Sequence, residues 1–353
     1  MPRRRLASLW RPFLASRPPM AKEVVPNFPA IRRFPSCDRL PHIPRKPLDE
    51  DGLVHMDVLP RSSHRDGSIY ECTHAWKKHY SVADRSETSL EAMSLTHPDR
   101  CVFLNGNCRR HPPNCMFQIF SLKLAKAPVD GGLVQLYGYI AVRDNLDPLL
   151  NYVVSAIRDD PIILEQGSSI KMAGPKRGID LCGNILIEYD MKIKTDGQEK
   201  HDLQVIDGAS LIRFKEMQNC QVITNRIGGD CGAIDITASG LEDAVEATIQ
   251  ILLSEVRTGF NLCLSCFPSE LKQEIQIFDG AVREPCGLKS SVVAVVIGSF
   301  LSFKFKVDLD SSDSVERQCS FRANNHGVST QNIKTDFALI SAKVTWSALP
   351  QGH

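Results

Sequence analysis

The chain has 353 residues, and its 42 lysines and arginines almost balance its 41 aspartates and glutamates, leaving a formal net charge of +1. That balance argues against a protein that coats nucleic acid, which would carry a basic excess over its folded part. Hydrophobic residues make up 42% of the chain, enough for a packed core, which excludes wholesale disorder. No apolar run reaches the roughly 18 residues that a membrane-spanning helix needs.

The N-terminal residues differ from the rest in charge and in proline content. Residues 1–48 carry 11 lysines and arginines and two acids, so the rest of the chain is net negative. Eleven of the 21 prolines lie in the first 60 residues, and proline cannot donate a backbone hydrogen bond to a helix or a sheet. This composition predicts a basic, disordered arm over residues 1–60, and we expect nucleic-acid binding only through this arm.

The same arm bears on where the protein resides. The arginine-rich stretch before Glu23 contains no acid, which is typical of an organellar transit peptide, although four prolines interrupt the helix that such a peptide forms. Translation from Met20 is the alternative. The 12 cysteines are spread from Cys37 to Cys319 without a dense framework, which favours reduced thiols and a cytoplasmic protein.

Residues 61–114 are predicted to be a linker with one short helix. Apolar side chains there recur at spacings of three and four, which places them on one helix face that docks against the main domain. Lys77 and its polar neighbours are expected to face solvent. The apolar face consists of Ile69, Cys72, Trp76 and Tyr80.

From residue 116 onward the hydrophobic period becomes two, which indicates β-strands. In residues 184–195 the apolar side chains point one way, while Glu188, Asp190 and the lysines after them point to the wet face. Residues 245–254 also alternate; a helix competes there because Ala244 and Ala247 are good helix formers, but the alternation favours a strand. The other predicted strands are 117–126, 133–143, 151–156, 203–214, 220–227, 232–238, 259–267, 273–283, 291–307 and 337–346.

Turn sequences separate these segments. Asp-Gly supplies the positive φ of tight turns, and we expect such turns at Asp196-Gly197, Asp207-Gly208 and Asp279-Gly280, with another at Gly228-Gly229-Asp230. Many short strands with few helices between them predict an antiparallel arrangement. The predicted fold is mainly β: an antiparallel β-sandwich-like domain over residues 115–348.

Six phrases in this region resemble a domain of unknown function that is abundant in grasses. The same domain forms the C-terminal companion of the cereal jasmonate-induced proteins, where it follows a ribosome-inactivating rRNA N-glycosylase domain. The resemblance covers roughly residues 115–348 and implies a plant protein of stress or defence physiology, but no agreed activity. The phrases are Met116–Ala125, Leu136–Asp144, Arg158–Pro161, Leu203–Ala209, Gly229–Ile236 and Ala244–Ile249.

The glycosylase chemistry of those relatives has no counterpart at the level of motifs. Its Glu-Ala-x-Arg helix stabilises charge as adenine departs, whereas the nearest string here, Glu246-Ala247-Thr248-Ile249, lacks the arginine and lies in an alternating stretch. Fewer than 115 residues precede the β domain, too few for a glycosylase domain. We therefore expect a non-catalytic protein, with an rRNA N-glycosylase or another hydrolase as the alternative.

Cysteine and histidine clusters raise the question of a metal. Cys101, Cys108, His111 and Cys115 offer four zinc ligands in one loop, but their spacing matches no common zinc finger, so we predict no metal and no cofactor. Cys263 and Cys266 have the spacing of a redox or zinc pair. Their surroundings predict a strand, which places the two sulfurs on opposite faces.

Charged loop residues are the remaining candidates for binding. Loops of a sandwich bind partners on a rigid scaffold, and aspartates gathered at one end also suit calcium, as in membrane-binding sandwich domains. The alternative is that the aspartates cap turns and pair with nearby arginines. The residues proposed for binding are Arg143, Asp144, Arg158, Asp159, Asp160 and Asp230.

Together these observations predict a non-catalytic interaction module with an unknown protein partner. An enzyme related to ribosome-inactivating proteins and a calcium-dependent membrane-binding domain are the alternatives.

Overall fold

The structure is a computed structural model and describes residues 48–82, 91–97, 100–104, 107–128, 131–195, 197–268, 270–308 and 314–350. Most of the predicted arm, residues 1–47, lies outside the described residues, as does Asp196 of one predicted turn. Residues 48–60 were expected to belong to the arm, but they contain a short strand that pairs in parallel with a strand of the main sheet.

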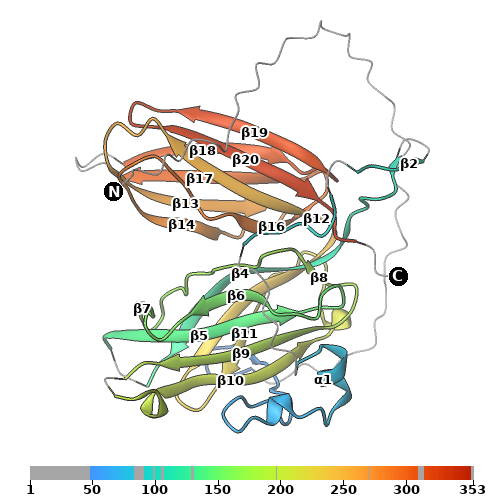
Figure 1. Cartoon of the computed structure of the whole chain (residues 1–353), viewed down its shortest axis with the longest axis vertical. Helices are drawn as coiled ribbons and strands as arrows, with labels where there is room; N and C mark the ends of the chain where they lie inside the picture. Colours follow the sequence, from blue (N-terminus) through green and yellow to red (C-terminus); the bar gives the residue numbers. More distant parts are fainter. Residues whose placement is uncertain are drawn as a thin grey trace, which may run out of the picture. The chain divides into compact units, whose positions relative to one another are not determined.

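The predicted mainly β, antiparallel fold is confirmed, with one short α-helix (Figure 1). The helical segments are α1 (Ala75–His79) and the 3₁₀ turns η1 (Ser68–Tyr70), η2 (Glu199–His201) and η3 (Phe214–Glu216). The strands are β1 (Val54–His55), β2 (Phe103–Leu104), β3 (Asn107–Cys108), β4 (Asn114–Lys126), β5 (Leu133–Arg143), β6 (Asn151–Ala156), β7 (Ile162–Glu165), β8 (Ile179–Asp180), β9 (Ile185–Ile193), β10 (Leu203–Ile212), β11 (Ile223–Gly228), β12 (Ala233–Ser254), β13 (Phe260–Pro268), β14 (Ile275–Val282), β15 (Cys286–Gly287), β16 (Ser291–Val296), β17 (Phe300–Asp308), β18 (Ser314–Arg322), β19 (Gly327–Lys334) and β20 (Leu339–Ser347).

The strands enclose two large hydrophobic clusters. In the first, the sheet β10-β9-β5-β6 packs against β4, β11 and the first half of β12, and Leu122, Ile187 and Ile234 lie between the two layers. In the second, the sheet β14-β13-β17-β18 packs against β19, β20, β16 and the second half of β12, around Phe303 and Trp346. Burial of such side chains contributes about 1.5–3 kcal/mol each, so each sandwich has its own apolar core.

Strand β12 takes part in both sandwiches. Its first half pairs with β11 and β4, and its second half pairs with β20, β16 and β15. The register with β4 shifts between Leu241 and Ala244, where Asp243 has a φ of 50°. The prediction of a strand over residues 245–254 is confirmed, and it continues from the strand predicted over residues 232–238.

Two of the predicted turns are wrong. Asp207-Gly208 lies inside β10 and Asp279-Gly280 lies inside β14. Gly208 has a φ of 139°, and a Cβ atom there would lie 2.9 Å from the Ser62 hydroxyl oxygen. Glycine is therefore needed at this position because another segment approaches the strand closely, and not because the chain turns.

The segment predicted to hold the docking helix is only partly helical. Ile69 and Tyr80 are buried as expected, but Cys72 is exposed because residues 71–74 form a turn between η1 and α1. Lys77 was expected to face solvent and is instead buried, with its ammonium donating to the carbonyl oxygen of Ser68.

Candidate functional site

Residues 58–82 cover the outer face of the sheet formed by β5, β9 and β10. The Leu59 amide donates to the carbonyl oxygen of Ala209 at 2.8 Å, and the Ala209 amide donates to the Ser62 hydroxyl at 3.1 Å. Ile69 and Tyr80 pack on Leu186 and Ala209 of the sheet. The face of β9 that was predicted to be wet is thus covered, and Glu188 on that face is buried.

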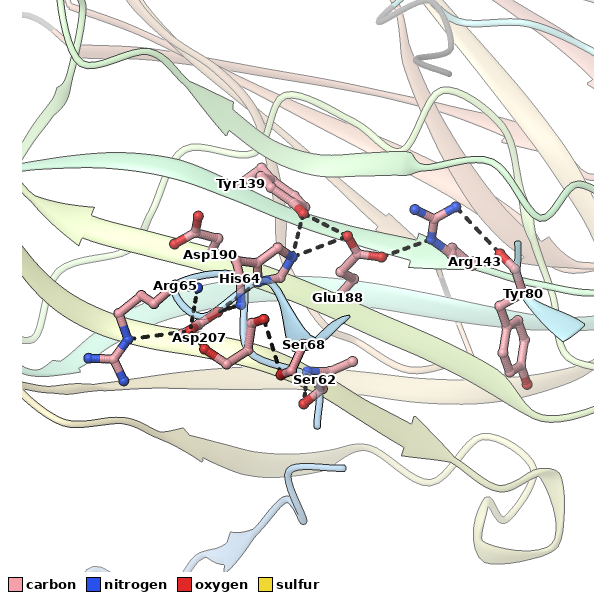
Figure 2. A network of polar contacts seen from close by, with 12 residues as sticks. Ser62, His64, Arg65, Ser68, Tyr80, Tyr139, Arg143, Glu188, Asp190 and Asp207 are labelled. Carbon is pink, nitrogen blue, oxygen red and sulfur yellow. Dashed lines mark hydrogen bonds and ion pairs between the residues drawn. The ribbon is translucent and has the colours of Figure 1, made fainter. Parts of the chain in front are cut away.

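His64 lies at the centre of this interface, between two carboxylates (Figure 2). Its Nδ1 is 2.7 Å from Asp207 Oδ1, and its Nε2 is 3.3 Å from Glu188 Oε1 and 2.8 Å from the Tyr139 hydroxyl. The His64 amide and the Ser63 hydroxyl also donate to Asp207, at 2.9 and 2.6 Å. We call His64, Asp207, Glu188, Tyr139 and Arg143 the His64 cluster.

The charges of this cluster compensate one another. Burial alone would lower the pKa of His64, but the hydrogen bonds to Asp207 and Glu188 outweigh it and raise that pKa from 6.5 to about 9. Burial likewise opposes ionisation of the two carboxyl groups, yet the bonds from His64 hold the pKa of both Asp207 and Glu188 below their usual range. At neutral pH, His64 is therefore an imidazolium held by two carboxylates.

Arg143 extends the cluster toward α1. Its Nε donates to Glu188 Oε2 at 2.9 Å, and its Nη1 donates to the carbonyl oxygens of Pro148 at 2.7 Å, Tyr80 at 3.4 Å and Ser81 at 3.5 Å. The Tyr139 hydroxyl donates to Glu188 Oε1 at 2.6 Å. Burial and the charge of Glu188 raise the pKa of Tyr139, so the phenol stays protonated and donates this bond.

The His64 cluster is better suited to holding residues 58–82 on the sheet than to proton transfer. A general base needs an available lone pair near neutral pH, whereas both His64 nitrogens are protonated and face acceptors inside the protein. No sequence motif identifies His64 as a site residue. The one sequence feature related to its site is that acidic residues occur in the alternating strands β9 and β10.

Two of the residues proposed for binding are buried in ion pairs. Arg143 belongs to the His64 cluster. Both oxygens of Asp144 accept from Arg177, at 2.6 and 2.9 Å, and Arg177 is fully buried. Asp144 also accepts from the amides of Leu146 and Asp180, at 3.1 and 2.9 Å.

The other proposed residues lie apart from this pair. Arg158 donates to Asp202 from Nε at 2.6 Å, and this bond, opposed by burial, lowers the pKa of Asp202. Asp159 and Asp160 are exposed in the turn after β6. Asp230 is exposed in the predicted turn between β11 and β12, which is confirmed, and pairs with Arg65 Nη1 at 2.6 Å.

A second cluster contains three of the four residues weighed as zinc ligands. One ligand atom from each of Cys101, Cys108, His111 and His326 lies within 4.8 Å of every other. Cys115 is not among them, because it lies at the start of the long strand β4, where its amide donates to the Asn114 side-chain oxygen and its carbonyl oxygen accepts from the Leu181 amide. His326 was missed because it lies more than 200 residues from the other three ligands.

The contacts inside this thiol–imidazole cluster are short. Cys108 Sγ is 3.1 Å from His111 Nδ1, and Cys101 Sγ is 3.3 Å from His326 Nε2. Burial alone would raise the pKa of the Cys108 thiol, but hydrogen bonding with His111 and with backbone groups lowers it to about 6. Cys263 and Cys266 lie on β13, and the predicted strand there is confirmed.

The hairpin that carries Cys101 and Cys108 presents apolar side chains to solvent. Val102, Phe103 and Leu104 are 54%, 64% and 50% exposed. The Arg109 amide donates to the carbonyl oxygen of Val102 at 2.7 Å, which closes the hairpin, and Arg109 and Arg110 are themselves exposed. This surface, residues 102–104 with the adjacent arginines, is called the hairpin surface below.

None of the helices in the described residues is both long enough and apolar enough to cross a membrane. No curated protein matches the chain.

Several solved structures of low sequence identity are similar to parts of the chain, among them the following two. Human GIVD cytosolic phospholipase A2 is 8% identical, with a TM-score of 0.23, and the match covers 69% of this chain and 34% of that one. The present chain thus spans about a third of the length of the phospholipase. A calcium-bound structure of two domains of extended-synaptotagmin 2 is 9% identical, with a TM-score of 0.26, and the match covers 69% of this chain and all of that one.

A family model matches residues 116–344 and is described as a domain of unknown function, DUF6598. The matched region contains nearly all of both sandwiches, including the sheet that residues 58–82 cover. The chain therefore belongs to the DUF6598 family.

Proposed function

We propose that the chain is a non-catalytic interaction module of a plant stress- or defence-related protein, and that it contacts a protein partner through the hairpin surface. The observation that carries this proposal is the run of three consecutive exposed apolar residues, Val102, Phe103 and Leu104. Such a run on a protein surface is unfavourable unless it has a function. Covering a side chain of this kind is worth about 1.5–3 kcal/mol when it becomes fully buried.

The charge beside the apolar run indicates the chemistry of the partner. Arg100, Arg109 and Arg110 are all exposed near the hairpin. Basic side chains at the rim of an apolar patch favour a partner whose apolar contact surface is bordered by carboxylates, because opposite charges speed association and fix the orientation. The backbone hydrogen bond from Arg109 to Val102 fixes the hairpin beforehand, which lowers the entropic cost of binding.

The non-catalytic part of the proposal is supported by the His64 cluster. The histidine, carboxylates and phenol that could have formed an acid–base site are bonded to one another and to the segment that they hold. The physiological setting rests on the six phrases that resemble the companion domain of jasmonate-induced proteins. None of the cysteines in the part of the chain that the structure describes forms a disulfide, which supports a cytoplasmic location. We propose nucleic-acid contact only for the basic N-terminal arm.

Affinity capture from jasmonate-treated leaves, followed by direct binding measurements with the purified captured protein, tests this proposal. Phe103→Ser/Leu104→Ser is the test variant, and Leu133→Ser/Ile163→Ser is the matched control, because its two residues are 68% and 64% exposed elsewhere. We expect the hairpin variant to raise the Kd at least tenfold, about 1.4 kcal/mol, and the control to leave it unchanged. Equal binding by both variants would overturn the proposal.

Two further assays distinguish the alternative functions. Ribosomes incubated with the protein and treated with aniline would release an RNA fragment if the chain were an N-glycosylase, and we expect none. Sedimentation with anionic liposomes, with calcium or with chelator, should show no calcium-dependent binding. A released fragment or a calcium-dependent pellet would replace the proposed function by the corresponding alternative.

A further inference from the structure

The thiol–imidazole cluster unites two distant parts of the chain. Cys101, Cys108 and His111 lie on and beside the β2–β3 hairpin, whereas His326 lies in the turn between β18 and β19. The Asn325 amide group donates to the carbonyl oxygen of His111 at 2.9 Å, so the two parts are also joined by a bond outside the cluster. This placement brings two sulfurs and two imidazoles to one point.

We propose that Cys101, Cys108, His111 and His326 form a tetrahedral zinc site. Zinc–sulfur bonds of about 2.3 Å and zinc–nitrogen bonds of about 2.0–2.1 Å place tetrahedral ligand atoms roughly 3.3–3.8 Å apart. The Cys108–His111 pair at 3.1 Å and the Cys101–His326 pair at 3.3 Å lie close to that range. All four ligand atoms fall within 4.8 Å of one another, so small side-chain rotations bring them to bonding distance of one ion.

The orientation of His111 supports this proposal independently. Its ring is fully buried, and its Nε2 lies 3.0 Å from the carbonyl oxygen of His97, to which it can only donate. In the neutral ring, the lone pair is then on Nδ1, which faces Cys108 Sγ. A backbone carbonyl that fixes the tautomer in this way is the usual companion of a zinc-bound histidine.

The donor set selects zinc and a structural role. Two thiolates and two imidazoles form the complete four-ligand set of structural zinc sites and leave no position open for water or substrate. Soft thiolates disfavour calcium and magnesium, which prefer oxygen ligands. Two separate thiol–imidazole hydrogen bonds would explain each pair, but they would not explain why both pairs converge.

The consequence is a hairpin fixed to the second sandwich. Cys101, Cys108 and His111 are close in sequence, and His326 adds an anchor 215 residues after His111. The zinc ion would therefore hold the hairpin against the β18–β19 turn. The site does not depend on the proposed protein partner, because every ligand belongs to this chain.

Zinc content of the full chain is the first test. The protein is purified under reducing conditions, supplied with zinc, dialysed against metal-free buffer and measured by mass spectrometry of the elements. We expect about one equivalent in the wild type and less than a tenth of an equivalent in Cys108→Ser and His326→Ala. Cys115→Ser is the matched control, since its thiol lies outside the cluster, and it should keep its zinc. Less than a tenth of an equivalent in the wild type, or equal loss in Cys115→Ser, would overturn the proposal.

Cobalt substitution gives a readout that does not depend on the folding of variants. The wild-type chain with Co²⁺ should show the visible bands of tetrahedral cobalt and a sulfur-to-metal charge-transfer band, and both should disappear on adding zinc. A spectrum typical of octahedral cobalt without thiolate ligands would contradict the site. Both measurements are made without a partner, so their failure and the failure of the proposed function are distinguishable.

Discussion

The His64 cluster and the thiol–imidazole cluster both fasten a loop segment to a sandwich by histidine, but they differ in what surrounds the ring. His64 faces two carboxylates, which neutralise it within the protein. His111 and His326 face thiols, which are weak hydrogen-bonding groups and strong metal ligands. Histidine thus holds residues 58–82 on the first sandwich without any added component. In the thiol–imidazole cluster it holds the β2–β3 hairpin on the second sandwich at full strength only with a bound zinc ion.

Removing the His64 side chain is the substitution expected to lower the free energy of unfolding most. His64→Ala leaves Glu188 and Asp207 buried with less compensating charge, and we expect the free energy of unfolding to fall by about 3–5 kcal/mol. Urea denaturation measures the loss. His79→Ala is the control, because His79 is exposed and its described hydrogen bond goes to the Asn145 side chain; it should cost less than about 0.5 kcal/mol. Equal effects of both substitutions would refute a special role for His64.

Alkaline pH should weaken the same cluster without a mutation. The folded pKa of His64, about 9, lies above the ordinary value of 6.5, so its stabilisation is complete below pH 6.5 and is lost as the pH rises through 9. Since one pKa unit corresponds to about 1.4 kcal/mol, the loss should approach roughly 3 kcal/mol. The charged and titratable groups that face the ring are Asp207, Glu188, Asp190, Tyr139 and Tyr70.

The comparison that checks this pH effect is denaturation from pH 6 to 10 of the wild type and of His64→Gln. Only the wild type should show the slope assigned to His64. At the acid end, the lowered pKa values of Asp207 and Glu188 predict stability that is present above about pH 4–5 and lost as the pH falls further. A His64→Gln curve parallel to the wild type at alkaline pH would contradict the assignment.

Removal of zinc by a chelator should lower the free energy of unfolding only through the thiol–imidazole cluster. A ligand that binds the folded state alone stabilises it by about 2.7 kcal/mol at a hundred times its Kd, and we expect a zinc-dependent gain of that order. Denaturation in zinc-buffered and in chelator-containing solution measures it, and His326→Ala should show no difference between the two. A zinc-dependent gain that persists in His326→Ala would place the ion elsewhere.

The smallest effect on the free energy of unfolding is expected for substitution of Arg65, at the exposed edge of the His64 cluster. Arg65 pairs with Asp230 at 2.6 Å and with the buried Asp207 at 3.4 Å, but the Arg65 side chain is 51% exposed, and ion pairs at such exposed positions contribute about 0–1 kcal/mol. Arg65→Ala should therefore change the free energy of unfolding by less than about 1 kcal/mol and should be insensitive to chelator. If Arg65→Ala lowered the free energy of unfolding as much as His64→Ala does, Arg65 and not the buried His64 ring would be the residue that holds this segment on the sheet.

Much of the fold was predictable because alternation along a strand records which face is buried. It identified β9 and the second half of β12, where a helix was the competitor. Strands β18 and β19 gave no such signal: β18 has only two buried residues, and β19 has none. The break between β16 and β17 at Gly298, whose φ is 79°, was likewise missed, because apolar residues continue closely on both sides of Gly298 and Ser299.

The sites were harder to predict because they join residues that are far apart in sequence. Cys101, Cys108 and His111 are neighbours along the chain and were recognised, but proximity suggested Cys115 as the fourth ligand where the fold supplies His326. Glu188 alternates as a solvent-facing residue would, and only the segment that covers it reveals its burial. One sequence records the period of a strand, but it does not record which loop returns to cover it.

The 22-residue strand β12 has a further consequence for how the molecule can be divided. Its first half pairs with strands that precede it in the chain, and its second half pairs with strands that follow it, apart from one pairing of Ala244 with Asn114. A cut near residue 243 would therefore leave each half with its own sheet neighbours. It would, however, place the fully buried Glu246 in one piece and the Gly178 amide that donates to it at 2.6 Å in the other, so each piece would present polar groups that are satisfied only when the two pieces associate.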